Sequence, residues 1–219
     1  MIEKILVVAA HPDDEWLGCG GTILKHLENG KEVHTLFICD GFSARTEKNK
    51  NGSRNKKTIE LMNKIGAETP VFLDFPDNKL DSINRLDVIK EIEKVKENID
   101  PVKVYTHYLF DMNIDHRIVS ESVHTAFRPI PESSCKSIFQ FEVLSSTEWS
   151  FDKIFSPNMH SDISDFIDLK IEYLKYYEEE MRSAPHTRSI ENVKNLSRYR
   201  GNSVGFDYAE SFVISRLLT

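Results

Sequence analysis

The chain has 219 residues, of which 40% are apolar, 29% charged and 10% aromatic. These proportions are ordinary for a globular protein and exclude collagen-like, low-complexity and disulfide-scaffold classes. The formal net charge of −7 provides no overall positive field, so we expect neither a nucleic-acid partner nor attraction to an anionic membrane. The length fits one domain, which we expect to span residues 1–219.

Apolar runs and cysteines indicate the compartment. The longest uninterrupted apolar run, Ile5 to Ala10, has 6 residues, whereas a helix that spans a membrane needs roughly 20. No signal-peptide pattern precedes that run, so we expect a cytoplasmic protein without membrane insertion. Cys19, Cys39 and Cys135 include no CxxC pair, so we expect buried free thiols rather than disulfides or zinc ligands.

Strand and helix patterns alternate along the first two thirds of the chain. Short β-branched runs without polar alternation are typical of strands buried on both faces of a parallel sheet. Such runs occur at 2–10, 33–41, 69–76, 102–107 and 137–144, and helical periodicity occurs at 16–30, 55–67, 83–99 and 118–127. The alternation predicts an α/β fold with a Rossmann-like, doubly wound, mostly parallel sheet and helices on both faces. We expect the common strand order 3-2-1-4-5.

Two further stretches have distinctive patterns. Residues 162–181 carry apolar side chains every three or four positions, which predicts one long amphipathic helix. Residues 45–57 carry six Lys or Arg and one Glu, and we expect them to form an exposed loop that can act as a lid.

Glycine-containing motifs of other enzyme classes fail on their context. Gly18, Gly20 and Gly21 do not match the dinucleotide-binding fingerprint, whose third glycine would fall at Ile23. We therefore expect these glycines to permit close packing of a helix on the sheet. The GxSxG pattern at 201–205 has no strand before it and no histidine after it, which excludes a nucleophile elbow.

Two strings rich in His and Asp follow the first and fourth predicted strands. The first is HPDDE at 11–15, and the second runs from His107 to His116. In the expected strand order these strands flank the point where the winding reverses, and ligands bind outside their carboxyl ends. We therefore expect the two strings to meet in one cleft.

His11, Asp14 and His116 are the candidate metal ligands. Two imidazoles and one carboxylate are typical of a catalytic zinc, which keeps its fourth position for water; Fe²⁺ or another divalent ion also stays open. Asp13 is the candidate general base, which would take a proton from that water and pass it to a leaving amine. Asp115 is expected to hydrogen-bond a ligand imidazole and fix its tautomer.

Through these motifs the chain resembles the PIG-L/LmbE-like zinc-dependent deacetylases. The likeness rests on AHPDDE and HxxxDxNxDH, with further matches at SPNMHSDIS, DLK, EEEM, PHTRS and RGNSVGFDYAESF. It implies hydrolysis of the acetyl group from an N-acetylated sugar, such as N-acetylglucosamine, or from a sugar conjugate. It also implies the same zinc ligands and Asp13 as the general base.

The chain departs from that family at one position, since many members have a histidine where this chain has Asn113. An Asn amide can donate a hydrogen bond to an oxyanion but carries no positive charge. We therefore expect Asn113 to stabilise the oxyanion, with cationic help from His186 or Arg188. Guanidinium groups match the phosphate oxygens of a nucleotide-linked sugar, so Arg54, Arg45 and Arg188 are candidate substrate contacts. The resemblance favours Arg54 and, less strongly, Arg45.

The expected partner is a small N-acetylated sugar, free or joined to a nucleotide, a lipid or a thiol conjugate. The sequence leaves a homo-oligomer open. Two other functions also stay open: a metal-dependent phosphoesterase, whose carboxylates would gather Mg²⁺ or two metal ions, and a nucleotide-binding protein without catalysis. The set of two histidines and one aspartate favours zinc over the metal ions of a phosphoesterase, and the failed glycine fingerprint weakens the nucleotide-binding alternative.

Overall fold

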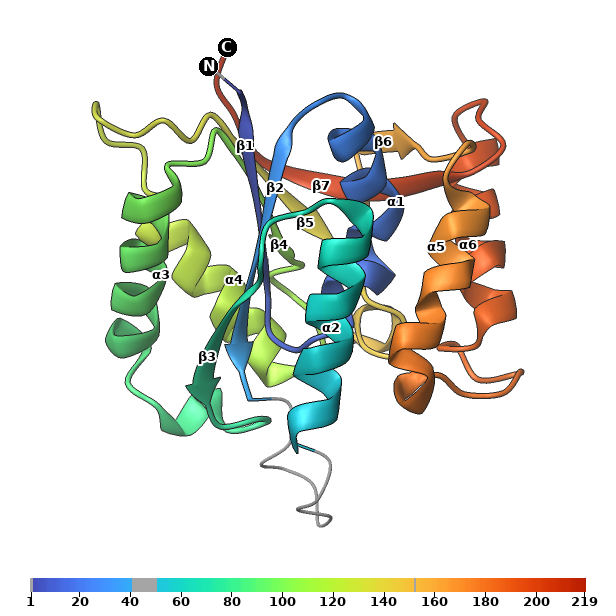
Figure 1. The fold of residues 1–219 in the computed structure, drawn as a ribbon, viewed down its shortest axis with the longest axis horizontal. Helices are drawn as coiled ribbons and strands as arrows, with labels where there is room; N and C mark the ends of the chain where they lie inside the picture. The colour runs from blue at the N-terminus through green and yellow to red at the C-terminus, as the bar shows by residue number, and fades with distance from the viewer. Residues whose placement is uncertain (1, 41–50, 152) are drawn as a thin grey trace.

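The structure, a computed structural model, describes residues 2–40, 51–151 and 153–219. Its sheet has the strand order β3-β2-β1-β4-β5-β7-β6, in which β1 to β5 are parallel and β7 is antiparallel to both of its neighbours (Figure 1). The expected order 3-2-1-4-5 is confirmed, and β7 and β6 extend the sheet beyond β5. The strands are β1 (Lys4–Ala9), β2 (Glu32–Cys39), β3 (Val71–Phe75), β4 (Lys103–His107), β5 (Ser137–Phe141), β6 (Met159–Asp162) and β7 (Ala209–Leu217).

Helices cover both faces of the sheet. Figure 1 shows α3 and α4 on one face and α1, α2, α5 and α6 on the other. This arrangement confirms the expected doubly wound α/β fold. The helices are α1 (Asp14–Glu28), α2 (Asn51–Ile65), α3 (Arg85–Ile99), α4 (Ile114–Ala126), α5 (Ile167–Tyr173) and α6 (Ile190–Asn202), with 3-10 helices η2 (Leu80–Ser82), η3 (Thr147–Trp149) and η4 (Leu174–Glu180).

Strand β1 shows why both faces must be covered. Its side chains alternate between two buried clusters: Leu6 and Val8 pack with residues of α3 and α4, whereas Ile5 and Val7 pack with residues of α1. Each fully buried aliphatic side chain contributes roughly 1.5–3 kcal/mol relative to an exposed one. The strand is therefore held firmly on both sides just before the chain reaches His11.

The expectation of one long helix over 162–181 is wrong. Strand β6 ends at Asp162, and the rest of the stretch forms α5 followed by η4. In η4 the buried residues are Leu174, Tyr177 and Glu180. A 3-10 helix has three residues per turn, so side chains at this spacing share one face. Part of the periodicity that suggested an α-helix therefore belongs to a tighter helix.

Two other boundaries differ from expectation. The expectation of a loop and lid over 45–57 is wrong for its second half, because α2 begins at Asn51. The first half, which includes Arg45, lies outside the described residues. Helix α4 begins at Ile114 rather than at Ile118, because Asn113 caps it by accepting a hydrogen bond from the Asp115 amide.

Two smaller expectations, buried free cysteines and glycines that permit close packing, are confirmed. All three cysteines are free and buried. A Cβ atom on Gly18 would overlap the ring of Phe141, and one on Gly21 would lie 2.8 Å from Ile163, so these glycines do permit close packing of α1. Among the described helices, none has the length and apolar character needed to cross a membrane.

Candidate metal centre

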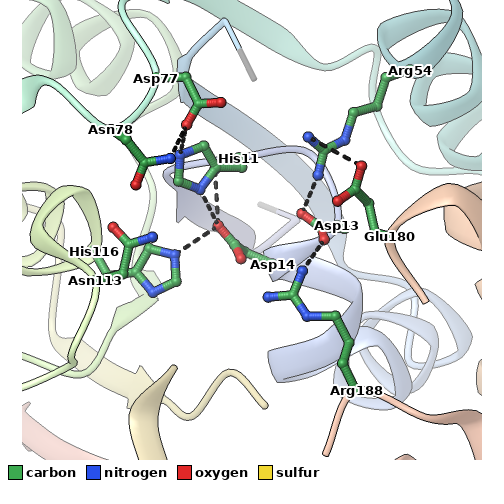
Figure 2. Close-up of a pocket in the computed structure, with 10 residues that line it drawn as sticks. All are labelled: His11, Asp13, Asp14, Arg54, Asp77, Asn78, Asn113, His116, Glu180 and Arg188. Carbon is green, nitrogen blue, oxygen red and sulfur yellow. Dashed lines mark hydrogen bonds and ion pairs between the residues drawn. The ribbon is translucent and has the colours of Figure 1, made fainter. Parts of the chain in front are cut away.

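A cavity of about 300 Å³ lies at the carboxyl ends of β1 and β4. His11 follows β1, and His116 lies in the first turn of α4, which follows β4. Because β1 and β4 are adjacent and parallel, the two strings of His and Asp meet as the strand order predicted. Figure 2 shows the residues that line the cavity: His11, Asp13, Asp14, Arg54, Asp77, Asn78, Asn113, His116, Glu180 and Arg188.

The side chains of His11, Asp14 and His116 converge on one point (Figure 2). His11 Nδ1 lies 3.2 Å from Asp14 Oδ2, and His116 Nε2 lies 3.3 Å from the same oxygen. A tetrahedral zinc with bonds of about 2.0–2.1 Å requires neighbouring ligand atoms about 3.3 Å apart. All three residues are buried, and their donor atoms lie within 4.8 Å of one another. The spacing and the donor chemistry therefore both fit a zinc ion.

A carboxylate contacts the outer nitrogen of each imidazole. Asp115 Oδ2 lies 3.2 Å and Asp77 Oδ1 lies 3.0 Å from His11 Nε2. On the other ring, Asp111 Oδ1 lies 3.2 Å from His116 Nδ1. A neutral imidazole that donates to such a carboxylate keeps its proton on the outer nitrogen and presents a lone pair on the inner one. This arrangement is typical of histidines that bind a metal.

The Asp115 carboxylate is itself fixed by the backbone that follows β3. The amides of Asn78 and Leu80 donate to its two oxygens, at 2.6 and 3.1 Å. Asp115 also forms a second group of donor atoms with His11 and Cys39. Burial raises the pKa of Cys39 to about 12, which disfavours the thiolate that a metal would need. We therefore place the candidate metal between the two histidines and Asp14.

The charges of the three candidate ligands depend on one another. Burial opposes ionisation of Asp14, but His116 and His11 hold the pKa of its carboxyl well below the usual range. Burial also opposes protonation of His116, but Asp14 and Asp111 raise the pKa of this imidazole to about 9. A divalent ion bound at this point would displace ring protons, so metal binding would release protons and depend on pH.

Asp13 lies beside this group, between two arginines (Figure 2). Its φ of 136° is a conformation that L-residues with a side chain rarely adopt, and it directs the chain into α1. Arg54 Nη2 donates to Oδ1 at 2.6 Å, and Arg188 Nη1 donates to Oδ2 at 2.9 Å. Burial raises the pKa of Asp13, while the two guanidinium groups act in the opposite direction. This balance suits a carboxyl group that takes up and then releases a proton.

Glu15 supports the unusual backbone of Asp13. Its Oε2 accepts a hydrogen bond from the Asp13 amide at 2.9 Å, and its Oε1 is hydrogen-bonded to the hydroxyl of Tyr177. Burial raises the pKa of Glu15 to about 8, so the side chain is mostly protonated near neutral pH. Glu15 therefore acts as a neutral hydrogen-bonding group rather than as a charge.

The residues expected to stabilise an oxyanion lie in different places. Asn113 lines the cavity, and because its Oδ1 accepts from the Asp115 amide at 2.8 Å, its Nδ2 is the group able to donate. His186 is not among the cavity-lining residues in the described part of the chain. Its Nδ1 accepts from the Arg188 amide at 3.0 Å, and its ring packs against Trp149.

Three acidic residues at the site were not assigned a role from the sequence. Asp111 belongs to the second string of His and Asp, and its position two residues before Asn113 is the sequence feature that could have identified it. Asp77 follows the end of β3, so the same rule that selected the other strand ends could have selected it. Glu180 lies 3.8 Å from Arg54 Nη1 and comes from η4, whose course could not be read from the sequence.

Comparisons with known proteins find relatives that are named as deacetylases. The family described as PIG-L: GlcNAc-PI de-N-acetylase matches residues 6–127, more than half of the chain, including Asp13 and the three candidate ligands. A diacetylchitobiose deacetylase from Thermococcus kodakarensis is 25% identical over 95% of this chain and 82% of its own length.

Two solved structures share the fold. An N,N'-diacetylchitobiose deacetylase from Pyrococcus horikoshii has a TM-score of 0.79 and 22% identity, covering 98% of this chain and 84% of its own. A 4-carboxy-2-hydroxymuconate hydratase from Pseudomonas putida KT2440 has a TM-score of 0.78 and 20% identity, covering 100% of this chain and 98% of its own. Because these two catalyse different reactions, the fold alone does not fix the chemistry. The match over residues 6–127 does fix the family: this chain belongs to the PIG-L family, described as GlcNAc-PI de-N-acetylase.

Proposed function

We propose that this protein is a metal-dependent deacetylase that hydrolyses the acetamide of a small N-acetylated sugar or sugar conjugate. The observation that carries the proposal is the convergence of His11, Asp14 and His116 in one cavity with Asp13 beside them. The relatives named as diacetylchitobiose deacetylases support a sugar substrate. The proposed ion is Zn²⁺; the same ligands could also hold Fe²⁺.

The reaction follows from what each side chain can do. When bound, zinc would polarise the acetamide oxygen and lower the pKa of a water molecule. Asp13 accepts a proton from the water as the water oxygen adds to the acetyl carbon. Asp13 then gives that proton to the nitrogen as the C–N bond breaks, so the products are acetate and a free amine. Arg54 and Arg188 hold the Asp13 carboxylate in one orientation through both steps.

Negative charge that develops on the acetyl oxygen needs a donor in the cavity. We assign this role to Asn113 rather than His186, because Asn113 lines the cavity and its amide plane is fixed by the Asp115 backbone. We also propose that the main role of Arg54 and Arg188 is to orient Asp13, because each donates a hydrogen bond to one of its carboxylate oxygens.

Acetate release tests this proposal. Wild-type protein and Asp13→Asn are compared on a panel of N-acetylated sugars, with phosphoesters as a second panel. General acid–base catalysis is typically worth about 10²–10⁴-fold, so we expect at least about a 100-fold loss of acetate release in Asp13→Asn. Phosphate release without acetate release would instead support the phosphoesterase.

A further inference from the structure

Helix α1, which begins at the candidate ligand Asp14, is interrupted at Cys19. The backbone there has φ −146° and ψ 23°, outside the helical range. In an uninterrupted helix the Gly21 amide would donate to the Leu17 carbonyl four residues earlier. Interruptions of this kind have identifiable causes, one of which is a side chain inserted between such partners.

A buried ion pair occupies the interruption. The Gly21 and Thr22 amides donate to the two carboxylate oxygens of Glu210, at 2.8 and 2.7 Å. Lys170 Nζ donates to the Leu17 carbonyl at 3.0 Å and to Glu210 Oε1 at 2.6 Å. The direct hydrogen bond from the Gly21 amide to the Leu17 carbonyl is therefore replaced by a chain of hydrogen bonds through Glu210 and Lys170. These two side chains satisfy groups on both sides of the break.

The ion pair ties α1 to elements far along the chain. Lys170 lies in α5 and Glu210 in β7, and both are almost fully buried, at 2% and 4% exposure. Buried charges are costly unless they are paired and hydrogen-bonded, as these are. The Lys170 carbonyl also accepts from the indole of Trp16 at 2.9 Å, which gives the segment before the break a second attachment to α5.

We propose that Lys170 and Glu210 are positioning residues for the candidate metal centre, because they fix residues 14–17 at the start of α1. This inference rests on the proposed function. The segment 14–17 carries Asp14 and Glu15, which holds the Asp13 amide. Both positioning residues lie outside residues 6–127, so the last quarter of the chain also determines the geometry of the site.

The chain offers a matched control. Arg200 Nε and Nη2 each lie 2.8 Å from an oxygen of Glu142, which makes a second ion pair, between α6 and the residue that follows β5. Among the hydrogen bonds of the described residues, neither of these side chains bonds to α1. Both side chains line the same small cavity as Leu17 and Lys170. A variant that removes this pair should lower stability, and it tests whether the start of α1 depends on the bonds to α1 or only on the packing of that cavity.

The experiment compares wild type with Lys170→Met, Lys170→Met/Glu210→Gln and the control Glu142→Gln/Arg200→Met. Three quantities are measured: the midpoint of chemical unfolding, the Zn²⁺ affinity by competition with a chromophoric chelator, and amide hydrogen exchange over 14–22. The double variant leaves no unpaired buried charge, so we expect it to regain part of the stability that Lys170→Met loses. We expect its Zn²⁺ affinity to stay about 10–100-fold below wild type, as for other groups that orient ligands, and its exchange over 14–22 to be faster.

The control variant should keep wild-type Zn²⁺ affinity and wild-type exchange over 14–22. The inference is overturned if the Lys170→Met/Glu210→Gln protein keeps wild-type Zn²⁺ affinity and wild-type exchange over 14–22. It is also overturned if the control variant shows the same loss of affinity and the same faster exchange. Wild-type protein that binds no Zn²⁺ would contradict the proposed function instead. In that case the exchange comparison still decides whether the ion pair holds the segment.

Discussion

Arg54 Nη2 lies 2.6 Å from Asp13 Oδ1, so the arginine expected to contact the substrate is bound to the candidate general base. Arg188 makes the equivalent contact with the other oxygen, at 2.9 Å. Burial raises the pKa of Asp13 and these two cations oppose the rise. The proton affinity of Asp13 therefore depends on both arginines.

Replacing Arg54 by Met should raise the pKa of Asp13, because burial is then opposed by only one cation. A neighbouring arginine changes an aspartate pKa by about 1–3 units, so the acid limb of kcat against pH should move upward by about one unit. Lys57→Met is the control, since Lys57 lies on the same helix but pairs with Glu178 outside the cavity. An unchanged acid limb with a raised KM would assign Arg54 to substrate binding instead.

Glu15→Gln should be tolerated and Glu15→Leu should not. Burial raises the pKa of Glu15 to about 8, so the native group is mostly neutral at pH 7, and Gln can still accept from the Asp13 amide. Leu leaves that buried amide without a partner, which costs about 1–3 kcal/mol. Urea unfolding and kcat at pH 7 measure both effects. Equal damage from the two substitutions would mean that Glu15 acts as a charge.

Asp111→Asn and Asp115→Asn should each weaken Zn²⁺ binding. These carboxylates contact the outer nitrogens of His116 and His11, and loss of such contacts typically costs 10–100-fold in affinity. Competition with a chromophoric chelator measures the change, with the exposed Asp168→Asn as the control. Asp77→Asn should have a smaller effect, because Asp115, whose two oxygens are held by the Asn78 and Leu80 amides, still contacts His11. Wild-type affinity in Asp111→Asn and Asp115→Asn would show that the imidazoles need no such support.

The sequence was sufficient for the parts of the site that depend on strand ends. Runs of buried residues located β1 and β4, and the rule for ligand sites in wound sheets brought His11 and His116 together. Asp115 was expected to contact a ligand imidazole, and it lies 3.2 Å from His11 Nε2. These inferences need only periodicity and chain order.

The remaining parts depend on packing between distant segments. The contact of Arg54 with Asp13 requires α2 to begin at Asn51, whereas a basic, Asn-rich composition suggested a loop. The place of Lys170 and Glu210 depends on the register of β7 and on the break in α1, neither of which leaves a periodic pattern. Side-chain pairs of this kind are visible only in three dimensions.

Away from the site, His26 should make stability depend on pH. Burial, with help from Lys103 and Lys31, lowers the pKa of His26 to about 4, against about 6.5 in an unfolded chain. Between these values the unfolded chain binds a proton that the folded chain does not. Stability is therefore complete above about pH 6.5 and falls as the pH decreases toward 4, by up to about 3 kcal/mol. Urea unfolding across this range should show a weaker dependence in His26→Gln; an equal dependence would contradict the assignment.

The most direct test of the central claim is acetate release from N-acetylated sugars before and after metal removal. The substrates are N-acetylglucosamine, di-N-acetylchitobiose and a nucleotide-linked N-acetylated sugar, and acetate and free amine are both measured. We predict that acetate and free amine are formed in equal amounts and that a chelator abolishes their release. Added Zn²⁺ should restore the release in the wild-type protein but not in the His116→Ala variant. Acetate release that survives complete metal removal, or none from protein that holds zinc, would contradict the account.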